Sequence, residues 1–200
     1  MKQYSGLSVV IKFGGHAMGE QASIEAFASD IVLLQQVGAK PVVVHGGGPQ
    51  IGSMLSRLEM ESNFIDGLRV TDQQTISIVE MVLAGAINKS LVTSISAAGG
   101  MSVGISGKDG NLIIAKKLNH RTKDTDSAIE NLVDLGYVGL PDKVDKQVLD
   151  ALLGVNMIPV VAPLGLGADG QTYNINADTA AGSIASALNA SRLLMLTDVD

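Results

Sequence analysis

The segments Ser8-Val-Val-Ile-Lys-Phe-Gly-Gly15 and Pro41-Val-Val-Val-His-Gly-Gly-Gly-Pro49 decide the fold. Each is a run rich in β-branched residues, typical of a buried strand, that ends in consecutive glycines. Each is followed by a predicted helix, over residues 22–36 and 50–58, and in the first of these apolar side chains recur on one face. Strand–helix alternation of this kind predicts a mainly parallel sheet covered by helices.

The alternation continues along the rest of the chain. We expect strands over residues 101–106, 112–116, 137–140, 157–161 and 192–196. We expect helices over residues 71–84, 86–98, 143–153 and 177–188, with a capping box from Thr71, a break at Gly85 and a cap at Asn176. Residues 63–70 are interpreted as a hairpin or irregular segment, and residues 116–127 and 165–171 as loops. The predicted fold class is α/β, with an open, mainly parallel sheet sandwiched by helices.

Composition limits the classes of function. The net charge of the 200 residues is −6, which argues against a nucleic-acid surface. The chain has no cysteine, and its three histidines lack metal-ligand spacing, so we expect no metal site on the protein. No apolar run approaches the roughly 20 residues of a membrane helix, and the amino terminus lacks the pattern of a signal peptide. We therefore expect a cytoplasmic protein with no nucleic-acid or membrane partner.

The two glycine clusters follow two early strands, at the sheet edge where parallel sheets bind ligands. Glycine lets backbone N–H groups approach an anion closely, and the helix after residue 49 adds partial positive charge. The sequence of residues 46–52, GGGPQIG, lacks the G-x-G-x-x-G spacing, and no G-x-x-x-x-G-K-[ST] motif occurs. One cluster alone would indicate only a tight turn, whereas two clusters favour a shared anion site that is not a standard nucleotide loop.

Three single residues and one segment are further polar features to weigh for this site. Lys12 lies inside an apolar strand, which favours a functional cation over an edge-strand lysine that reaches solvent. Arg69 is able to pair with a carboxylate, but its spacing alone favours a surface salt bridge. Residues 174–178, NINAD, either cap a helix or supply polar groups to a site, and the spacing leaves both interpretations open. His45 is better explained as a packed structural histidine than as a catalytic base.

Taken together and in this order, these segments resemble the amino acid kinase family, most closely its N-acetylglutamate kinase branch. The resemblance covers nearly the whole chain and is carried by residues 10–15 (VIKFGG), 41–52 (PVVVHGGGPQIG), 66–72 (DGLRVTD), 81–85 (MVLAG), 88–89 (NK), 107–110 (GKDG) and 173–179 (YNINADT). The first and last of these segments are shared by the wider family. The combination of HGGGPQIG, GLRVTD and NINAD points to the branch.

The resemblance implies catalytic roles for one lysine and one aspartate. Lys12 would stabilise the transferring phosphoryl group, and Asp178 would orient the lysines that flank it. The N–H groups of Gly47 and Gly48 would hold the reacting carboxylate and the phosphoryl oxygens.

The resemblance also implies contacts with substrate and nucleotide. Arg69 would bind a carboxylate of the substrate, and Asn174 would bind the substrate as well. Gly14, Gly15 and Asp198 would belong to the nucleotide site.

The activity implied by the resemblance is transfer of the ATP γ-phosphoryl group, with Mg²⁺, to the side-chain carboxylate of N-acetyl-L-glutamate in arginine biosynthesis. Residues 1–189 would form a lobe that binds the acyl amino acid and forms a homodimer. Residues 190–200 would begin an ATP-binding lobe, so the chain is interpreted as a fragment truncated at its carboxyl end. A PII-type regulator is a further partner that the branch suggests.

Two alternatives remain open from the sequence. One is a sister kinase that acts on aspartate, carbamate, UMP or an aminoadipate derivative. The other is a truncated, non-catalytic module that binds the substrate without transferring phosphate. Arg69 and Asn174 favour N-acetyl-L-glutamate over the sister substrates.

Overall fold

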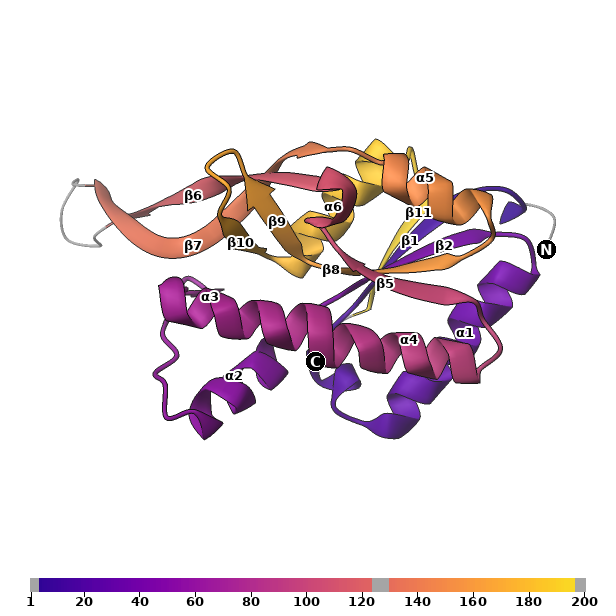
Figure 1. Cartoon of the computed structure of the whole chain (residues 1–200), viewed down its shortest axis with the longest axis horizontal. Coiled ribbons are helices and arrows are strands. Elements are labelled where there is room, and N and C mark those ends of the chain that lie inside the picture. The colour runs from indigo at the N-terminus through magenta and orange to yellow at the C-terminus, as the bar shows by residue number, and fades with distance from the viewer. Residues whose placement is uncertain (1–3, 124–129, 197–200) are drawn as a thin grey trace.

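The computed structural model describes residues 4–123 and 130–196, and it arranges them as a parallel sheet between two helical layers (Figure 1). Below the sheet in this view lie α1 (Gln21–Gln36), α2 (Gly48–Arg57), α3 (Gln73–Glu80) and α4 (Asn88–Ala97). Above it lie α5 (Gln147–Gly154) and α6 (Ala177–Ala187). This arrangement confirms the predicted α/β class.

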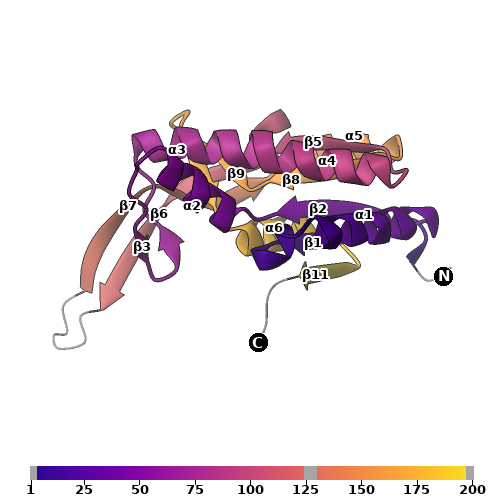
Figure 2. The ribbon, with the colours of Figure 1, turned by 90° about the horizontal axis from the view of Figure 1, so that it is seen from below.

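The parallel sheet has five strands in the order β11 (Arg192–Leu196), β1 (Ser8–Phe13), β2 (Lys40–His45), β8 (Ile158–Ala162) and β5 (Ser102–Ser106). All neighbouring pairs run parallel, and Figure 2 shows β11 at the outer edge beside β1. Phe13 on β1 is the register partner of His45 on β2. The glycines that follow these two residues therefore meet at one edge of the sheet, as the sequence predicts.

The side chains of β1 alternate between the two helical layers. Val9, Ile11 and Phe13 pack in the core shared with α1, α2, α3 and α4, whereas Val10 packs in the core shared with α5 and α6. Lys12 lies two residues after Val10 and therefore points to the side of α6. Strand geometry thus fixes the direction of the cation in β1.

A second sheet of four strands, called here the barrel, closes on itself beside the parallel sheet. Its order is β10 (Thr172–Ile175), β7 (Glu130–Val144), β6 (Ile113–Lys123) and β9 (Leu164–Gly167). Figure 1 shows β6 and β7 extending from the body of the molecule as a long hairpin.

The loop predicted over residues 116–127 is wrong for residues 116–123, which belong to β6, and residues 124–129 lie outside the described part of the chain. The loop predicted over residues 165–171 is wrong for residues 165–167, which belong to β9. The charged side chains that suggested a loop form ion pairs between the two strands β6 and β7. Lys116 Nζ lies 2.9 Å from Asp142 Oδ1, and Lys117 Nζ lies 2.8 Å from Asp134 Oδ1. Because both partners sit on β7, far along the chain, the local sequence gives no sign of the pairing.

One helix of 25 residues, over residues 73–97, replaces the two helices predicted on either side of Gly85. Its middle, Met81–Ile87, is a π-helical segment, η3, that joins α3 to α4. Glycine weakens a helix by about 1 kcal/mol, but it does not end one whose neighbouring turns are buried. By length and hydropathy this helix could cross a membrane, yet its buried side chains pack in the core with α1 and α2, as those of a core helix do.

Two helix starts differ from the predictions. Helix α3 is capped by Asp72, whose carboxylate accepts a hydrogen bond from Thr75 N at 2.8 Å. The hydroxyl of Thr71, the predicted cap, instead donates to Arg69 O at 2.9 Å. Helix α5 begins four residues later than predicted, because β7 continues through the intervening segment.

Candidate functional site

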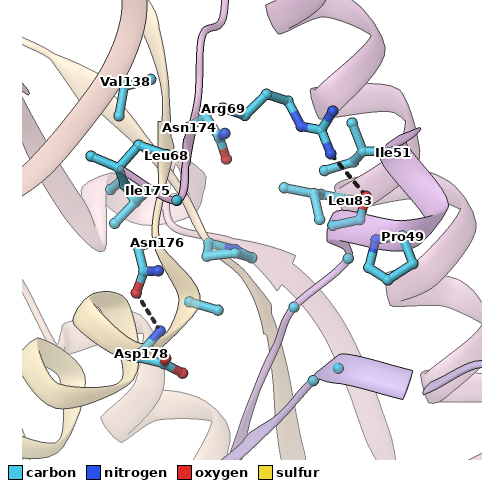
Figure 3. Close-up of a pocket in the computed structure, with 18 of the residues that line it drawn as sticks. Pro49, Ile51, Leu68, Arg69, Leu83, Val138, Asn174, Ile175, Asn176 and Asp178 are labelled. Carbon is cyan, nitrogen blue, oxygen red and sulfur yellow. Dashed lines mark hydrogen bonds between the residues drawn. The ribbon is translucent and has the colours of Figure 1, made fainter. Parts of the chain in front are cut away.

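A cavity of about 320 Å³ opens at the carboxyl-terminal edge of the parallel sheet, where the barrel meets the starts of α2 and α6 (Figure 3). Its walls include eight of the nine residues singled out from the sequence: Lys12, Gly14, Gly15, Gly47, Gly48, Arg69, Asn174 and Asp178. The ninth, Asp198, lies outside the described residues. Segments from both halves of the chain therefore converge on one space.

One wall is the glycine edge, which comprises Gly14, Gly15, Gly46, Gly47 and Gly48. The two turns are in direct contact, because Gly46 N donates to Phe13 O at 2.8 Å and a Cβ on Gly46 would lie 3.4 Å from the Cα of Gly14. A Cβ on Gly14 would lie 2.8 Å from Cε and Nζ of Lys12, so glycine at this position leaves room for the lysine side chain. The two backbones pack against each other with no side chain between them.

Gly47 has a separate reason to be glycine. A Cβ there would lie 2.5 Å from Ile87 Cδ1 and 2.7 Å from Leu83 Cδ2, both in the π-helical segment. The long helix therefore packs directly against the glycine edge. Gly48, by contrast, has open space on the side where a Cβ would be.

Helix α2 starts at the cavity wall. Gly47 is its N-cap, Pro49 lies in its first turn, and no side chain caps it. The first N–H groups of a helix have no partner within the helix, and they carry partial positive charge. An anion in the cavity is therefore a suitable partner for the start of α2.

Lys12 is the cation nearest to the glycine edge. Its side chain is buried, lies over Gly14 and places Nζ 3.0 Å from Asp178 Oδ1 at the start of α6. The alternative of a lysine that reaches solvent from an edge strand is wrong, because β1 lies between β11 and β2. Asp178 is half-exposed, so the pair is open to the cavity on the carboxylate side.

The segment 174–178 serves both purposes that the sequence left open. Asn176 caps α6, because its Oδ1 accepts from Asp178 N at 2.9 Å and from Thr179 N at 3.0 Å. The side chain of Asn174 lies in the cavity wall, on the side of β10 opposite to the buried Tyr173. Figure 3 shows Asn174, Asn176 and Asp178 along the same wall.

Arg69, at the end of β4 (Leu68–Arg69), reaches across to the start of α2. Its Nη2 donates to Gly48 O at 2.9 Å, its Nη1 donates to Ser62 Oγ, and its guanidinium lies 4.5 Å from the centre of the Phe64 ring on β3 (Phe64–Ile65). The side chain is buried, so the surface salt bridge favoured by spacing is not what forms. Burial lowers the pKa of Arg69 from its usual value, but arginine remains charged.

His45 is structural, as the sequence suggests. It is fully buried, with Nδ1 2.8 Å from Gly46 O and Nε2 3.2 Å from Asn88 Nδ2 on α4. These partners assign the proton to Nδ1 and the acceptor role to Nε2. Burial lowers the pKa of His45 to about 4, so the ring is neutral and holds the turn after β2 in place.

The apolar part of the cavity was not predicted from the sequence. The side chains that form it come from separate elements and include Ile51, Phe64, Leu68, Leu83, Val138 and Ile175. In the sequence they look like ordinary core positions, because nothing local marks a side chain that lies at the border of a cavity. Leu83 is both buried in the core and part of the wall.

The arrangement suits a small ligand with more than one negative charge. A lysine and a helix start lie at one end, an arginine lies at the side, and an amide and an apolar surface complete the wall. Such groups bind carboxylate and phosphate oxygens through charge-assisted hydrogen bonds. No group of three or more histidine, cysteine, aspartate or glutamate side chains in the described parts of the chain forms a metal-binding cluster.

Comparisons with known proteins agree with this chemistry. The model of the amino acid kinase family matches residues 8–200. The acetylglutamate kinase of Gluconobacter oxydans (strain 621H) is 59% identical over 199 residues, which are 100% of this chain and 68% of that protein. The chain thus spans about two thirds of the length of this relative.

Two solved structures resemble the fold. The protein smu.665 from Streptococcus mutans UA159 superimposes with a TM-score of 0.82 at 31% identity, over 96% of this chain and 73% of that one. The N-acetylglutamate synthase from Neisseria gonorrhoeae, complexed with coenzyme A and N-acetyl-glutamate, gives a TM-score of 0.80 at 26% identity, over 99% of this chain and 43% of that one.

Proposed function

This chain belongs to the amino acid kinase family, and from that premise we propose that it phosphorylates the side-chain carboxylate of N-acetyl-L-glutamate with ATP. The observation that carries the proposal is the single cavity that combines Lys12, the glycine edge and Arg69. The name of the 59% identical relative, and the N-acetyl-glutamate in the complex of the synthase relative, support this choice of substrate.

The chemistry requires no general base. A side-chain carboxylate with a pKa of roughly 4.3 is ionised at neutral pH and is already a nucleophile. One of its oxygens forms a bond to the γ-phosphorus as the bond to the β,γ-bridging oxygen breaks, and the leaving electron pair stays on ADP. Catalysis then consists of holding two anions together and stabilising the charge on the phosphoryl oxygens.

Each wall of the cavity has a part in this step. Lys12 stabilises the transferring phosphoryl group, and Asp178 holds the ammonium in position at 3.0 Å. The N–H groups of Gly47 and Gly48 bind the reacting carboxylate and the phosphoryl oxygens at the start of α2. The neutral, buried His45 takes no proton in this scheme.

Arg69 and Asn174 recognise the part of the substrate that does not react. The guanidinium of Arg69 binds the α-carboxylate, while its bond to Gly48 O keeps it beside the reacting end. Asn174 offers an amide to the acylated amino group. The apolar wall, which includes Leu68 and Val138, is in contact with the methylene groups and the acetyl methyl.

ATP binds with its γ-phosphate toward the glycine edge, next to Gly14 and Gly15, and Asp198 belongs to the same nucleotide site. Among the described residues that line the cavity, Asp178 is the one acidic residue, so Mg²⁺ is expected to enter on the phosphates of ATP. When bound, Mg²⁺ neutralises charge on the β- and γ-phosphates.

The organisation of the molecule is also part of the proposal. Residues 1–189 form the lobe that binds the acyl amino acid and dimerises, and residues 190–200 begin the ATP-binding lobe. The reaction belongs to arginine biosynthesis and takes place in the cytoplasm. A PII-type protein is a regulatory partner suggested by the branch, and light scattering with and without such a protein tests both associations.

Calorimetric binding of N-acetyl-L-glutamate to the chain, without nucleotide, tests the substrate. L-Aspartate and UMP are the controls, because they are substrates of sister kinases. We expect selective binding that is lost in Arg69→Ala and partly recovered in Arg69→Lys. Equal binding of all three ligands, or none by a folded sample, would overturn the choice of N-acetyl-L-glutamate.

A further inference from the structure

Three side chains join the long helix to the barrel just outside the cavity, and we call them the Glu80 cluster. Lys108 Nζ lies 2.6 Å from Glu80 Oε1 and donates to Thr172 Oγ1 at 2.7 Å. The hydroxyl of Thr172 donates to Glu80 Oε2 at 3.3 Å. Glu80 ends α3, Thr172 begins β10, and Lys108 lies in the turn after β5, so three separate elements meet at one carboxylate.

On the barrel side, the cluster binds the strand that carries Asn174. Thr172 and Asn174 are two residues apart in β10, and their side chains therefore point to the same face, whereas Tyr173 and Ile175 are buried on the other. Because β10 has only four residues, its first residue cannot shift without moving the third. The bonds made by Thr172 thus act on the same short strand that carries Asn174.

On the helix side, the cluster is connected to the glycine edge. Glu80 ends α3, and Leu83 lies three residues later in the π-helical segment that continues the same helix. Leu83 lies in the cavity wall, and its Cδ2 would be 2.7 Å from a Cβ on Gly47. One continuous helix therefore contacts the glycine edge through Leu83 and the barrel through Glu80.

We propose that the Glu80 cluster sets the distance between the glycine edge and Asn174 and so selects the length of the acyl amino acid. The inference rests on the proposed function, in which the reacting carboxylate lies at Gly47 and Gly48 and the acylated amino group lies at Asn174. N-acetyl-L-aspartate is one methylene shorter than N-acetyl-L-glutamate. With both walls fixed, the shorter ligand reaches only one of them.

A purely structural role predicts a different result. Lys108 and Glu80 are partly exposed, with side-chain exposures of 29% and 38%, and ion pairs of this kind add little stability. If the cluster only stabilised the fold, its loss would weaken the binding of both ligands by the same factor. The ratio of the two dissociation constants is therefore the informative quantity.

The test is calorimetric measurement of the dissociation constants of N-acetyl-L-glutamate and N-acetyl-L-aspartate for the whole chain. One methylene in a fitted site typically changes affinity by about 10- to 200-fold, so we expect at least about tenfold preference for the glutamate derivative in the unaltered chain. Lys108→Met should reduce this preference at least fivefold, mainly by improving the relative binding of the shorter ligand.

Two further variants sharpen the test. Thr172→Val keeps the shape of the side chain but removes the hydroxyl, and it should reduce the preference as well, whereas Thr172→Ser should retain it. Lys116→Met is the matched control, because Lys116 makes an ion pair with Asp142 at 2.9 Å on the exposed hairpin. It should leave the ratio unchanged.

The outcomes separate the inference from the function on which it rests. If the unaltered chain prefers N-acetyl-L-glutamate but Lys108→Met and Thr172→Val both keep its ratio, the length-selecting role of the cluster is wrong and the proposed substrate stands. If Lys116→Met changes the ratio of dissociation constants as much as Lys108→Met does, the length-selecting role of the cluster is also wrong. If the unaltered, folded chain binds neither ligand, the proposed substrate fails first and the inference fails with it.

Discussion

The two walls of the cavity are built in opposite ways. The glycine edge consists of two turns that directly follow two neighbouring parallel strands, so its geometry is set within a few residues of sequence. The facing wall is a four-residue strand of the barrel, in which Asn174 pairs with Val138 on β7 and with Leu164 on β9. The geometry of the glycine edge, where phosphoryl transfer is proposed, is therefore set by residues close together in sequence. The geometry of β10, which is proposed to recognise the substrate, depends on pairing with strands far away in sequence.

The largest effect is expected from damage to the barrel. Gly136 on β7 has φ of +72° and forms a bridge with Thr71, whose carbonyl oxygen would overlap a Cβ at position 136. Gly136→Ala should lower the free energy of unfolding by about 3 to 5 kcal/mol, because backbone must move against backbone. Urea unfolding measures this change.

Gly170→Ala is the matched control for that substitution. Gly170 has nearly the same φ, +77°, but open space where a Cβ would be. It should lose only about 1 kcal/mol, the strain of the left-handed conformation itself. Equal losses in the two variants would mean that the contact with Thr71 is unimportant.

On the glycine edge, loss of a cation should impair chemistry more than folding. Lys12→Met should slow phosphoryl transfer about 100- to 1,000-fold, the usual effect of removing one group that stabilises transition-state charge. Trapping the acyl phosphate with hydroxylamine measures the rate. The affinity for N-acetyl-L-glutamate should change by less than about threefold, because Arg69 and Asn174 remain.

Lys117→Met controls for the loss of a charge, since Lys117 pairs with Asp134 at 2.8 Å on the exposed hairpin. It should leave the transfer rate unchanged. A Lys12→Met variant that transfers phosphate at the normal rate would remove Lys12 from the mechanism.

These two regions also explain what could be predicted from sequence. The parallel sheet and its glycine turns follow from β-branched runs and glycine clusters, which are local signals. Lys12 could be recognised because a lysine inside an otherwise apolar strand favours a functional role for its charge. Arg69 and Asn174 also line the cavity, but local spacing left their roles undecided, and only the family resemblance assigned them to the substrate.

The strands of the barrel have no comparable local signal in the sequence. Strand β6 is polar because Lys116 and Lys117 pair with carboxylates on β7, and in the sequence such a segment is indistinguishable from a solvated loop. The break predicted at Gly85 failed for a related reason. Burial of Leu83 and Ile87 against Gly47 keeps the helix continuous, and that contact joins residues about 40 positions apart.

The buried His45, which directly precedes Gly46 of the glycine edge, predicts a pH dependence of stability. The pKa of His45 in the folded chain is about 4, below its ordinary value of 6.5, so below pH 6.5 the unfolded chain binds a proton that the folded chain does not. The stabilising contribution of neutral His45 is complete above pH 6.5 and is lost as the pH falls toward 4. Between pH 6.5 and 5 the loss is about 2 kcal/mol.

Urea unfolding of His45→Gln at pH 7, 6 and 5 isolates this contribution. The variant should be less stable at pH 7, because the bond between His45 Nε2 and Asn88 is altered, but its stability should fall less steeply toward pH 5. Parallel slopes for the variant and the unaltered chain would show that His45 is not the titrating group.

The smallest effect is expected from a variant of Asn176, which lies where the two walls join. Asn176 follows β10 directly, caps α6 and holds Asp178, whose carboxylate reaches Lys12 at 3.0 Å. Asn176→Ala should lower the free energy of unfolding by about 1 kcal/mol, as for other helix caps, and should slow transfer because Asp178 is less well oriented. Asp72→Ala removes the cap of α3 instead, so a similar loss of stability is expected with a normal transfer rate. If both variants slow transfer equally, Asn176 acts only through stability, and the barrel then influences the glycine edge through the long helix alone.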